Sequence, residues 1–484
     1  MSYNKIFDMV VIGAGLSGVG AACRYKIKFP NDNILIFESR ASIGGTWDLF
    51  KYPGIRSDSD MLTLGYDFRP WTGNKTLADG KSIRDYIHSV AKEYDIMQFI
   101  KYMSEVTSVN YSTKECLWHI TLKNLKTGLN EFVKTKFIVS STGYYRYDKG
   151  HTPAFSGQSK FLGKFIHPQN WPEDLDYKNK NMIVIGSGAT AFTLVPELSK
   201  KAKHVTMLQR SPSYVASIPS VDRIGIIVRS IMPKNLAFKV NRFKNIFLAR
   251  YLYLKARNNP EKSRNWFRKK VIKELGTNYP VDLHFNPKYN PWDQRVCMVP
   301  DGDIFSAIRN GKASIVTDEI DQFDASGISL KSGEYLDADI IVSATGLEVL
   351  INGGCEIYID GKKQELSDCF GYKGTMYSGI PNYFSIFGYT NASWTLRVNL
   401  ISEFVLRVIE YVKINEYKKV VPIMKVRMQK YPWINFQAGY FLRVMDKLPN
   451  QGDRHPWLNL QDYKIDKKLL TQDPIDDGDL IFSD

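Results

Sequence analysis

Cysteine is scarce in this chain, and its spacing offers no covalent or metal chemistry. Only five of the 484 residues are cysteines, at positions 23, 116, 297, 355 and 369. No C-x-x-C pair occurs, so neither a disulfide framework nor a zinc site is favoured, and we expect no metal. Such a composition is typical of a reducing cytoplasm, which is the expected location.

Long apolar runs and negative charge are also in short supply. No run of about 18 uncharged apolar residues exists, so we expect no membrane-spanning helix, and residues 1–9 lack the apolar stretch of a signal peptide. There are 65 Lys and Arg against 50 Asp and Glu, a net charge of +15. This excess is compatible with nucleic acid, an anionic membrane surface or anionic cofactors, and charge alone does not distinguish them.

What the chain does contain is a strand, a glycine-rich turn and a helix, in that order, twice. In the first copy an apolar strand at 7–12 leads through Gly13, Gly15 and Gly18 into a helix that reaches residue 28, and a second strand ends at Glu38. Glycines at this spacing let a pyrophosphate approach the helix amides, and an acid about 20 residues further on accepts hydrogen bonds from ribose hydroxyls. We expect Ser17 to cap the helix.

The second copy differs at the position that reads the ribose. Its strand at 181–185 is followed by the turn Gly186, Ser187, Gly188, Ala189, Thr190 and Ala191. The next strand, at 204–208, ends in Arg210 and Ser211 instead of an acid. An arginine pairs with a 2′-phosphate, so this site is predicted to prefer NADPH; the alternative is a solvated arginine at a strand end.

A site with a ribose acid beside an NADP-type site is what a flavoprotein with a nicotinamide reductant requires. We therefore expect FAD in the first unit and NADPH in the second, and O2 as the electron acceptor because no redox-active dithiol is present. The predicted fold class is α/β, with two Rossmann-like dinucleotide-binding domains and a helical insertion. The predicted domains are 1–145 with 345–484 for FAD, 146–215 with 286–344 for NADPH, and 216–285 for the insertion.

The predicted insertion is strongly basic. Between residues 223 and 274, fifteen Lys and Arg stand against Glu261 and Glu274, mixed with Ile, Leu, Phe and Tyr. One interpretation is a membrane-surface face that draws apolar substrates from lipid; the other is an amphipathic helical subdomain whose basic side is solvated. Since most of the excess charge lies here, nucleic acid becomes the least favoured partner, and oligomeric state is left open.

Five further motifs indicate a family. They are Phe161-x-Gly163-x3-His167-x3-Trp171-Pro172 and the segments 44–48, 52–60, 290–295 and 388–395. With these motifs the chain resembles, over nearly its whole length, the type I Baeyer-Villiger monooxygenases, a branch of the flavin-containing monooxygenases. The ending Trp171-Pro172 is the detail that separates this branch from related N- and S-oxygenases.

The resemblance implies a reaction. A C4a-peroxyflavin would insert one oxygen of O2 into a ketone to give an ester or lactone, and would also oxidise sulfides and thioamides. Arg295 matches the family's catalytic arginine, and Asp58 matches the aspartate that orients it. The alternative for Arg295 is a surface arginine in a turn, and the alternative for Asp58 is an ordinary polar loop. Alternative functions are an N- or S-oxygenase without carbonyl insertion, and a membrane- or RNA-binding protein on a redox-inert scaffold.

The resemblance also implies cofactor contacts outside the glycine turns. His167 is expected in the linker between domains, and Gln294 replaces a lysine that many relatives use for the 2′-phosphate, which leaves Arg210 as the main contact. Tyr389 and Asn391 are expected in the flavin and substrate pocket or in plain core. The remaining expected cofactor contacts are Gly45, Thr46, Trp47, Arg56, Ser57, Asp58, Val106 and Trp394.

Overall fold

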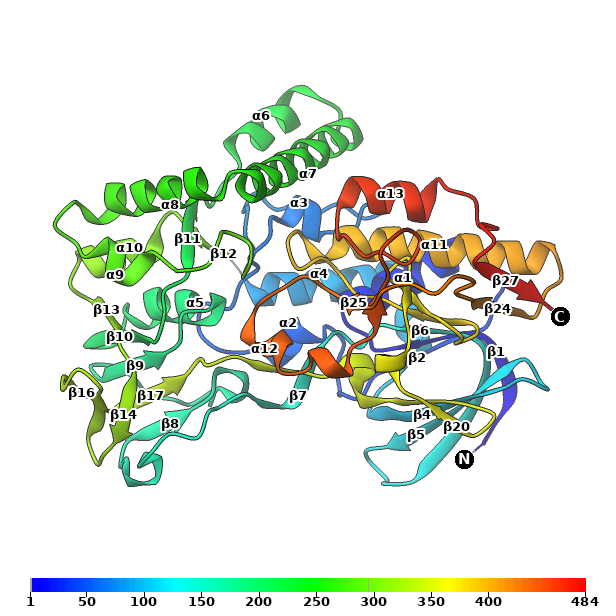
Figure 1. Cartoon of the computed structure of the whole chain (residues 1–484), viewed down its shortest axis with the longest axis horizontal. Helices are drawn as coiled ribbons and strands as arrows, with labels where there is room; N and C mark the ends of the chain where they lie inside the picture. Colours follow the sequence, from blue (N-terminus) through cyan, green and yellow to red (C-terminus); the bar gives the residue numbers. More distant parts are fainter. Residues whose placement is uncertain (1, 295) are drawn as a thin grey trace.

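The computed structural model describes residues 2–294 and 296–484 as two α/β lobes that lie side by side (Figure 1). One lobe is built on a nine-stranded sheet in the order β20-β19-β4-β5-β6-β1-β2-β3, with β23 paired to β6. The bounds are β1 Ser2–Ile12, β2 Ile34–Phe37, β3 Ile100–Lys101, β4 Ser104–Ser112, β5 Leu117–Asn124, β6 Asn130–Ser140, β19 Glu356–Ile359, β20 Lys362–Gln364 and β23 Tyr383–Ser385. Both ends of the chain lie in this lobe.

Alternate residues of β1 point to opposite faces of this sheet, and helices cover one of these two faces. Met9 and Val11 pack in one core with α1 (Leu16–Lys28), α4 (Gly80–Glu93) and α11 (Trp394–Ile414), while Val10 and Ile12 pack in a second core with β4 and β5. Short helices complete the lobe at α2 Thr46–Leu49, α3 Met61–Leu64, α12 Gly439–Leu442 and α13 Tyr463–Thr471. Minor strands are β21 Gly371–Tyr372, β22 Met376–Tyr377, β24 Lys419–Pro422, β25 Tyr431–Pro432, β26 Asn450–Gln451 and β27 Leu480–Ser483.

The other lobe holds a five-stranded, all-parallel sheet in the order β13-β10-β9-β17-β8. Its bounds are β8 Lys164–Ile166, β9 Asn181–Ile185, β10 His204–Gln209, β13 Ala313–Thr317 and β17 Ile340–Ser343. A separate meander pairs β14 Ile320–Phe323, β15 Gly327–Leu330 and β16 Tyr335–Asp337. Helices α5 (Ala189–Leu198), α9 (Val281–Phe285) and α10 (Asp303–Arg309) pack against the sheet. The predicted α/β class with two dinucleotide-binding units is confirmed.

The chain crosses between the lobes through a two-stranded antiparallel link formed by β7 (Tyr145–Gly150) and β18 (Leu347–Val349). His167 ties this link together, because its Nε2 lies 3.1 Å from the carbonyl oxygen of Gly346 and its Nδ1 accepts a hydrogen bond from the Gln169 amide. His167, which directly follows β8, therefore contacts this link through its side chain.

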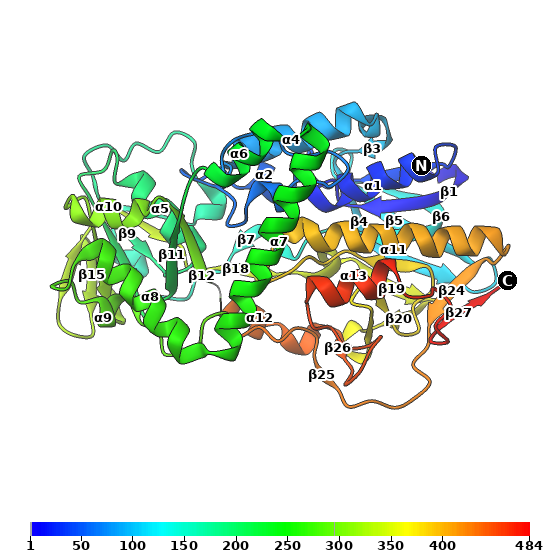
Figure 2. The ribbon, with the colours of Figure 1, turned by 90° about the horizontal axis from the view of Figure 1, so that it is seen from above.

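The basic segment is helical, as predicted, and forms α6 (Arg223–Ile231), α7 (Lys234–Asn258) and α8 (Pro260–Leu275). It leaves the second lobe beside the parallel pair β11 (Tyr214–Ile218) and β12 (Val296–Pro300). Seen from above, α7 runs across the molecule from α8 toward the first lobe (Figure 2). Within the described residues, no helix has both the length and the hydropathy of a bilayer span.

Candidate active site

The first glycine turn packs so closely that side chains are excluded at two positions. Gly13 has φ +99°, and a Cβ there would lie 2.7 Å from the carbonyl oxygen of Ser141. A Cβ on Gly18 would lie only 1.9 Å from the carbonyl oxygen of Gly13. Gly15 faces the backbone of Gly45 across the turn, with a Cβ-to-Cα distance of 3.5 Å. Two glycine-bearing backbones therefore line a narrow cradle at the start of α1.

Glu38 lies at the carboxyl end of β2, beside this turn. Its side chain is 4% exposed and accepts hydrogen bonds from the amides of Ala14, at 2.8 Å, and Arg40, at 2.9 Å. Burial raises the pKa of Glu38, against the two amides that favour its ionised form. The amide of Ser104 donates to the Glu38 carbonyl, which brings Val106 in β4 to the same region. Glu38, predicted to contact the ribose, and Val106, predicted as a further cofactor contact, thus come from adjacent elements.

One local prediction is wrong. Ser17 does not cap α1, since the cap residue is Gly15, which has no side chain, and Ser17 lies inside the helix. The Ser17 hydroxyl instead accepts a hydrogen bond from the indole Nε1 of Trp394, at 2.8 Å. A residue at the start of α11 is thereby fixed against the first turn of α1.

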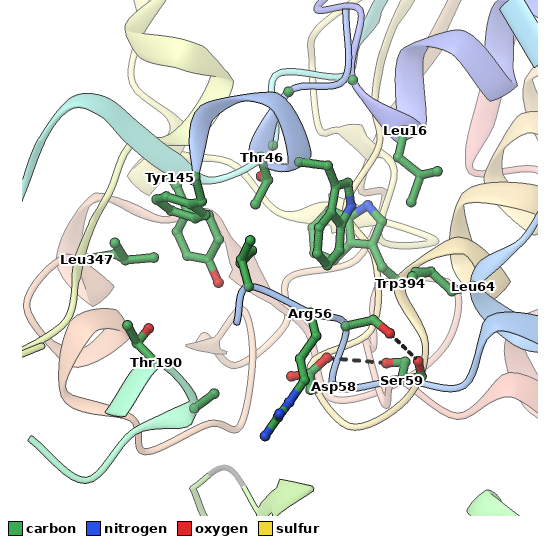
Figure 3. A pocket seen from close by; sticks show the side chains of 18 of the residues that line it. Leu16, Thr46, Arg56, Asp58, Ser59, Leu64, Tyr145, Thr190, Leu347 and Trp394 are labelled. Atoms are coloured by element: carbon green, nitrogen blue, oxygen red, sulfur yellow. Dashed lines mark hydrogen bonds between the residues drawn. The ribbon is translucent and has the colours of Figure 1, made fainter. Parts of the chain in front are cut away.

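A cavity of about 230 Å³ opens directly beyond the cradle (Figure 3). Trp394, Tyr145 and Asp58 surround it, and they come from three separate segments of the chain. Tyr389 and Asn391 are both expected in the flavin and substrate pocket. Tyr389 lines the cavity, and Asn391 does not. The predicted cofactor contacts that line the cavity are Gly15, Ser17, Gly45, Thr46, Trp47, Arg56, Ser57, Asp58, Ala189, Thr190 and Trp394.

The polar side of this cavity is a loop with two charged residues. Asp58 Oδ1 accepts a hydrogen bond from the Ser59 hydroxyl at 3.4 Å. Arg56 Nη1 donates to Asp303 Oδ2 at 2.7 Å, and this ion pair joins the first lobe to the start of α10 in the second. Burial raises the pKa of Asp303, and the Arg56 guanidinium opposes that shift. Arg295 lies outside the described residues, so its pairing with Asp58 stays a prediction.

The second glycine turn opens on a larger cavity of about 650 Å³. Gly186 has φ +132°, and a Cβ there would lie 2.4 Å from the carbonyl oxygen of Ala344, whereas a Cβ on Gly188 would meet no atom within 4 Å. Ala191 does not line the cavity, because it is buried within α5. The predicted residues that do line it are Gly186, Ser187, Gly188, Ala189, Thr190, Arg210, Ser211 and Gln294.

The polar groups of this second cavity suit an anion. Arg210 is exposed at the end of β10. Nearby, the Ser187 hydroxyl donates to the Ser211 carbonyl at 2.8 Å, and the Ser213 hydroxyl donates to Ser187 Oγ at 3.3 Å. A guanidinium beside an open glycine turn at a helix start combines two groups that bind phosphates in proteins.

The two cavities share part of their walls. Five residues line both: Tyr145, Ala189, Thr190, Cys297 and Leu347. The second glycine turn therefore borders the cavity that the first turn opens into. Sequence reasoning missed Tyr145 and its neighbour Tyr144, whose hydroxyls lie 2.7 Å apart. Their position directly after the turn at Thr142 and Gly143 was the available clue.

The loop that leads to Arg295 is held by the insertion. Trp292 has φ +69° and packs edge-on against Tyr253 of α7, with ring centroids 6.0 Å apart. Arg257 of α7 forms an ion pair with Asp293. Tyr253, Arg257 and Trp292 also line a third cavity, of about 720 Å³, together with Asn391. The basic helix thus reaches the segment that carries the predicted catalytic arginine.

Comparison with known proteins agrees with this arrangement. Residues 66–350 match the family described as flavin-binding monooxygenase-like, and residues 11–69 match an NAD(P)-binding Rossmann-like domain. The FAD-containing monooxygenase EthA of Mycobacterium tuberculosis is 47% identical over 480 residues, which cover 98% of this chain and 97% of that protein. The probable FAD-binding monooxygenase AlmA of Acinetobacter baylyi is 44% identical over 483 residues, covering 99% and 96%.

Solved structures share the fold. An oxidized steroid monooxygenase bound to NADP aligns with a TM-score of 0.78 at 20% identity and covers 99% of this chain and 100% of that one. Cyclohexanone monooxygenase in an open structure aligns with a TM-score of 0.72 at 20% identity, covering 87% of this chain and 90% of that one. At this identity the likeness supports the architecture, with two dinucleotide-binding units on either side of a link.

Proposed function

The chain belongs to the flavin-binding monooxygenase-like family and is a flavin-dependent monooxygenase, and from this premise we propose that it binds FAD and NADPH and inserts one oxygen atom of O2 into ketones. The products are esters or lactones. Soft sulfur centres in sulfides and thioamides are further substrates. The observation that carries the proposal is the wall shared by the two cavities, because it brings the two dinucleotide sites to one reaction space.

The residues present fit the two cofactors. For FAD, the cradle has no room for side chains at Gly13 and Gly18 and faces the backbone of Gly45 at Gly15, which suits a pyrophosphate. The buried carboxylate of Glu38 lies beside this turn and would accept hydrogen bonds from the ribose hydroxyls. For NADPH, the open space at Gly188 would admit the pyrophosphate, and Arg210, which lines the same cavity, would pair with the 2′-phosphate. Bound FAD supplies the transfer of electrons from NADPH to O2.

The chain's own residues have three tasks in this reaction. Arg295 provides a fixed cation that stabilises negative charge developing on oxygen, and Asp58 holds that cation in place by pairing with it. Trp394, fixed by its hydrogen bond to Ser17, and Tyr145 close the cavity to water with aromatic surface. Arg56 and Asp303 keep the two lobes at the separation that the shared wall needs.

The test compares NADPH consumed with ester formed by the holoenzyme on linear, cyclic and aryl ketones, and with sulfoxide formed from sulfides. We expect ester in proportion to NADPH, and Arg295→Ala to lose ester by about a hundredfold or more while it still reduces its flavin with NADPH. The matched control is Arg427→Ala, which removes an exposed arginine outside the three cavities and should leave ester yield unchanged.

Two results would overturn the proposal. NADPH oxidation without ester from any ketone, alongside efficient sulfoxide formation, would assign the enzyme to sulfur or nitrogen oxygenation alone. Ester formation by Arg295→Ala at the wild-type rate would remove the role given to that arginine.

A further inference from the structure

The long basic helix α7 is amphipathic with its polar side turned toward the protein. Asn241 and Arg242 are buried, and Asn241 Nδ2 donates to the carbonyl of Gly225 at 3.1 Å. Arg242 Nη1 donates to the carbonyl of Gly65 at 3.0 Å. One turn further on, Asn245 Nδ2 donates to Asp60 Oδ1 at 2.8 Å. Arg242 and Asn245 therefore anchor α7 to the first lobe, and Asn241 anchors it to α6.

The opposite side of α7 is an exposed aromatic stripe. Phe243 is 70% exposed, Phe247 61% and Tyr251 50%, and their spacing of four residues places them on one face of the helix. Their rings stack along that face, with centroids 6.3 and 6.4 Å apart. On α6, Ile224, Ile227 and Ile231 repeat the pattern and are also exposed. We call these six residues the hairpin face.

This orientation decides between the two interpretations of the basic insertion. A helical subdomain that simply solvates its basic side would pack its apolar side on the protein body. Here the apolar side faces away from the body, and in Figure 2 α7 crosses in front of the middle of the molecule. An exposed apolar face of this kind marks an interaction site.

The positive charges beside the aromatic stripe indicate which kind of partner this face binds. Lys239 and Lys255 flank the aromatic stripe of α7 and are exposed, and Lys234 is exposed at the start of the helix. In the described part of the chain these three lysines form no ion pair with a carboxylate, and Lys255 Nζ lies 5.8 Å from the ring centre of Tyr251. A second copy of this chain would bring like charges together. Single-stranded nucleic acid offers phosphates and bases that stack on aromatic rings, but it has no aliphatic layer to cover the exposed isoleucines of α6.

We propose that the hairpin of α6 and α7 docks on an anionic lipid surface. The hairpin face enters the boundary between headgroups and acyl chains, and Lys234, Lys239 and Lys255 contact the headgroup phosphates. This docking does not depend on the reaction proposed above, because none of these nine residues lines any of the three cavities. α7 then connects the lipid surface to the third cavity through Tyr253 and Arg257.

The experiment is cosedimentation of the holoenzyme with phosphatidylcholine vesicles that do or do not contain phosphatidylglycerol. We expect binding at low salt to the mixed vesicles, weak binding to pure phosphatidylcholine, and release at high salt. Phe243→Ser with Phe247→Ser should lower the bound fraction at least about tenfold, and Lys239→Glu with Lys255→Glu should do the same. All these variants should keep FAD and the wild-type rate on a water-soluble substrate, which shows that they are folded.

Matched controls change the same chemistry elsewhere. Leu162→Ser with Ile414→Ser removes two exposed apolar side chains, and Lys114→Glu with Lys126→Glu reverses two exposed charges, all in the body of the protein. These controls should bind vesicles like the wild type.

Several outcomes would overturn the proposal. These are absence of the wild type from the vesicle pellet at low salt, equal binding by the hairpin variants and the wild type, and binding to single-stranded RNA in place of vesicles. Sedimentation velocity supplies a fourth: a dimer that Phe243→Ser with Phe247→Ser dissociates, in a protein that ignores vesicles, would assign the face to a second copy.

Discussion

The two glycine turns have the same backbone form but different surroundings. In each, the first glycine has a positive φ and lies under a carbonyl from the neighbouring strand end, Ser141 above Gly13 and Ala344 above Gly186. Those carbonyls follow β6 and β17, the strands that lie beside β1 and β9 in their sheets. The shared form therefore comes from the same pairing of a glycine-rich strand end with a parallel neighbour.

The difference lies in how much protein closes over each turn. The third small residue of the first turn is Gly18, where an added Cβ would lie 1.9 Å from a backbone atom. The corresponding residue of the second turn is Ala191, whose own Cβ fits in the buried interior. The first turn faces the backbone of Gly45, and Gly188 faces open space. A closed site retains its ligand and an open site exchanges it, which fits a resident FAD and an NADPH that is consumed in each turnover.

The largest effect is expected when the alanine found in the second turn replaces the corresponding glycine of the first turn. Gly18→Ala forces a Cβ against the Gly13 carbonyl, and since both atoms belong to backbone or are attached to it, the helix must move. We expect a loss of about 3 kcal/mol in the free energy of unfolding and purification largely without FAD. The ratio of flavin to protein absorbance and denaturant unfolding measure both effects.

The control for this exchange is Gly188→Ala. A Cβ there meets nothing within 4 Å, so FAD content and stability should stay at the wild-type level, and only the affinity for NADPH should fall. Full flavin content in Gly18→Ala would show that the first turn is not as closed as the contacts indicate.

Local patterns in the sequence were enough to predict both units. The helix at 16–28 and the strand at 181–185 have the predicted ends because glycine spacing and apolar runs act over a few residues. The hydrogen bond between Trp394 and Ser17 joins residues that lie 377 positions apart. It depends on how α11 packs on α1, and this packing cannot be predicted from a pattern of neighbouring residues. Periodicity likewise shows that α7 has an apolar side, but contacts with the first lobe decide that this side faces outward.

The second expected effect concerns the opposite charges that follow the two turns, Glu38 in the first and Arg210 in the second. Arg210→Ala removes the cation that we propose pairs with the 2′-phosphate, so the KM for NADPH should rise about 30-fold, which corresponds to one charge-assisted contact. The KM for NADH, which lacks that phosphate, should change by less than about twofold. Steady-state kinetics with both cofactors measure the selectivity.

Lys312→Ala is the matched control for Arg210. Lys312 is exposed and precedes β13, at the opposite end of the same parallel sheet. It removes one positive charge without touching the cavity, so neither KM should change. Equal losses for NADPH and NADH in Arg210→Ala would contradict the assignment of the 2′-phosphate to this residue.

The smallest effect lies in the link that joins the two units. His167 accepts a hydrogen bond at Nδ1 from the Gln169 amide and therefore carries its proton on Nε2, which donates to the Gly346 carbonyl. Burial lowers the pKa of His167 below its ordinary value of 6.5, and neighbouring His151 adds to that shift. A proton on Nδ1 would remove the acceptor of the Gln169 amide. The folded link thus requires the neutral ring.

The sign of the resulting pH dependence follows from the lowered pKa. Below about pH 6.5 the unfolded chain takes up a proton that the folded His167 resists, so stability falls as the pH falls, by at most about 1.4 kcal/mol per pH unit. Thermal melting of the holoenzyme from about pH 7.5 to about pH 5.5 should show a larger drop in Tm for the wild type than for His167→Gln. Other buried histidines such as His284 titrate equally in both proteins and cancel in the comparison. Parallel melting curves for the two would mean that His167 is not the group that senses acid between the units.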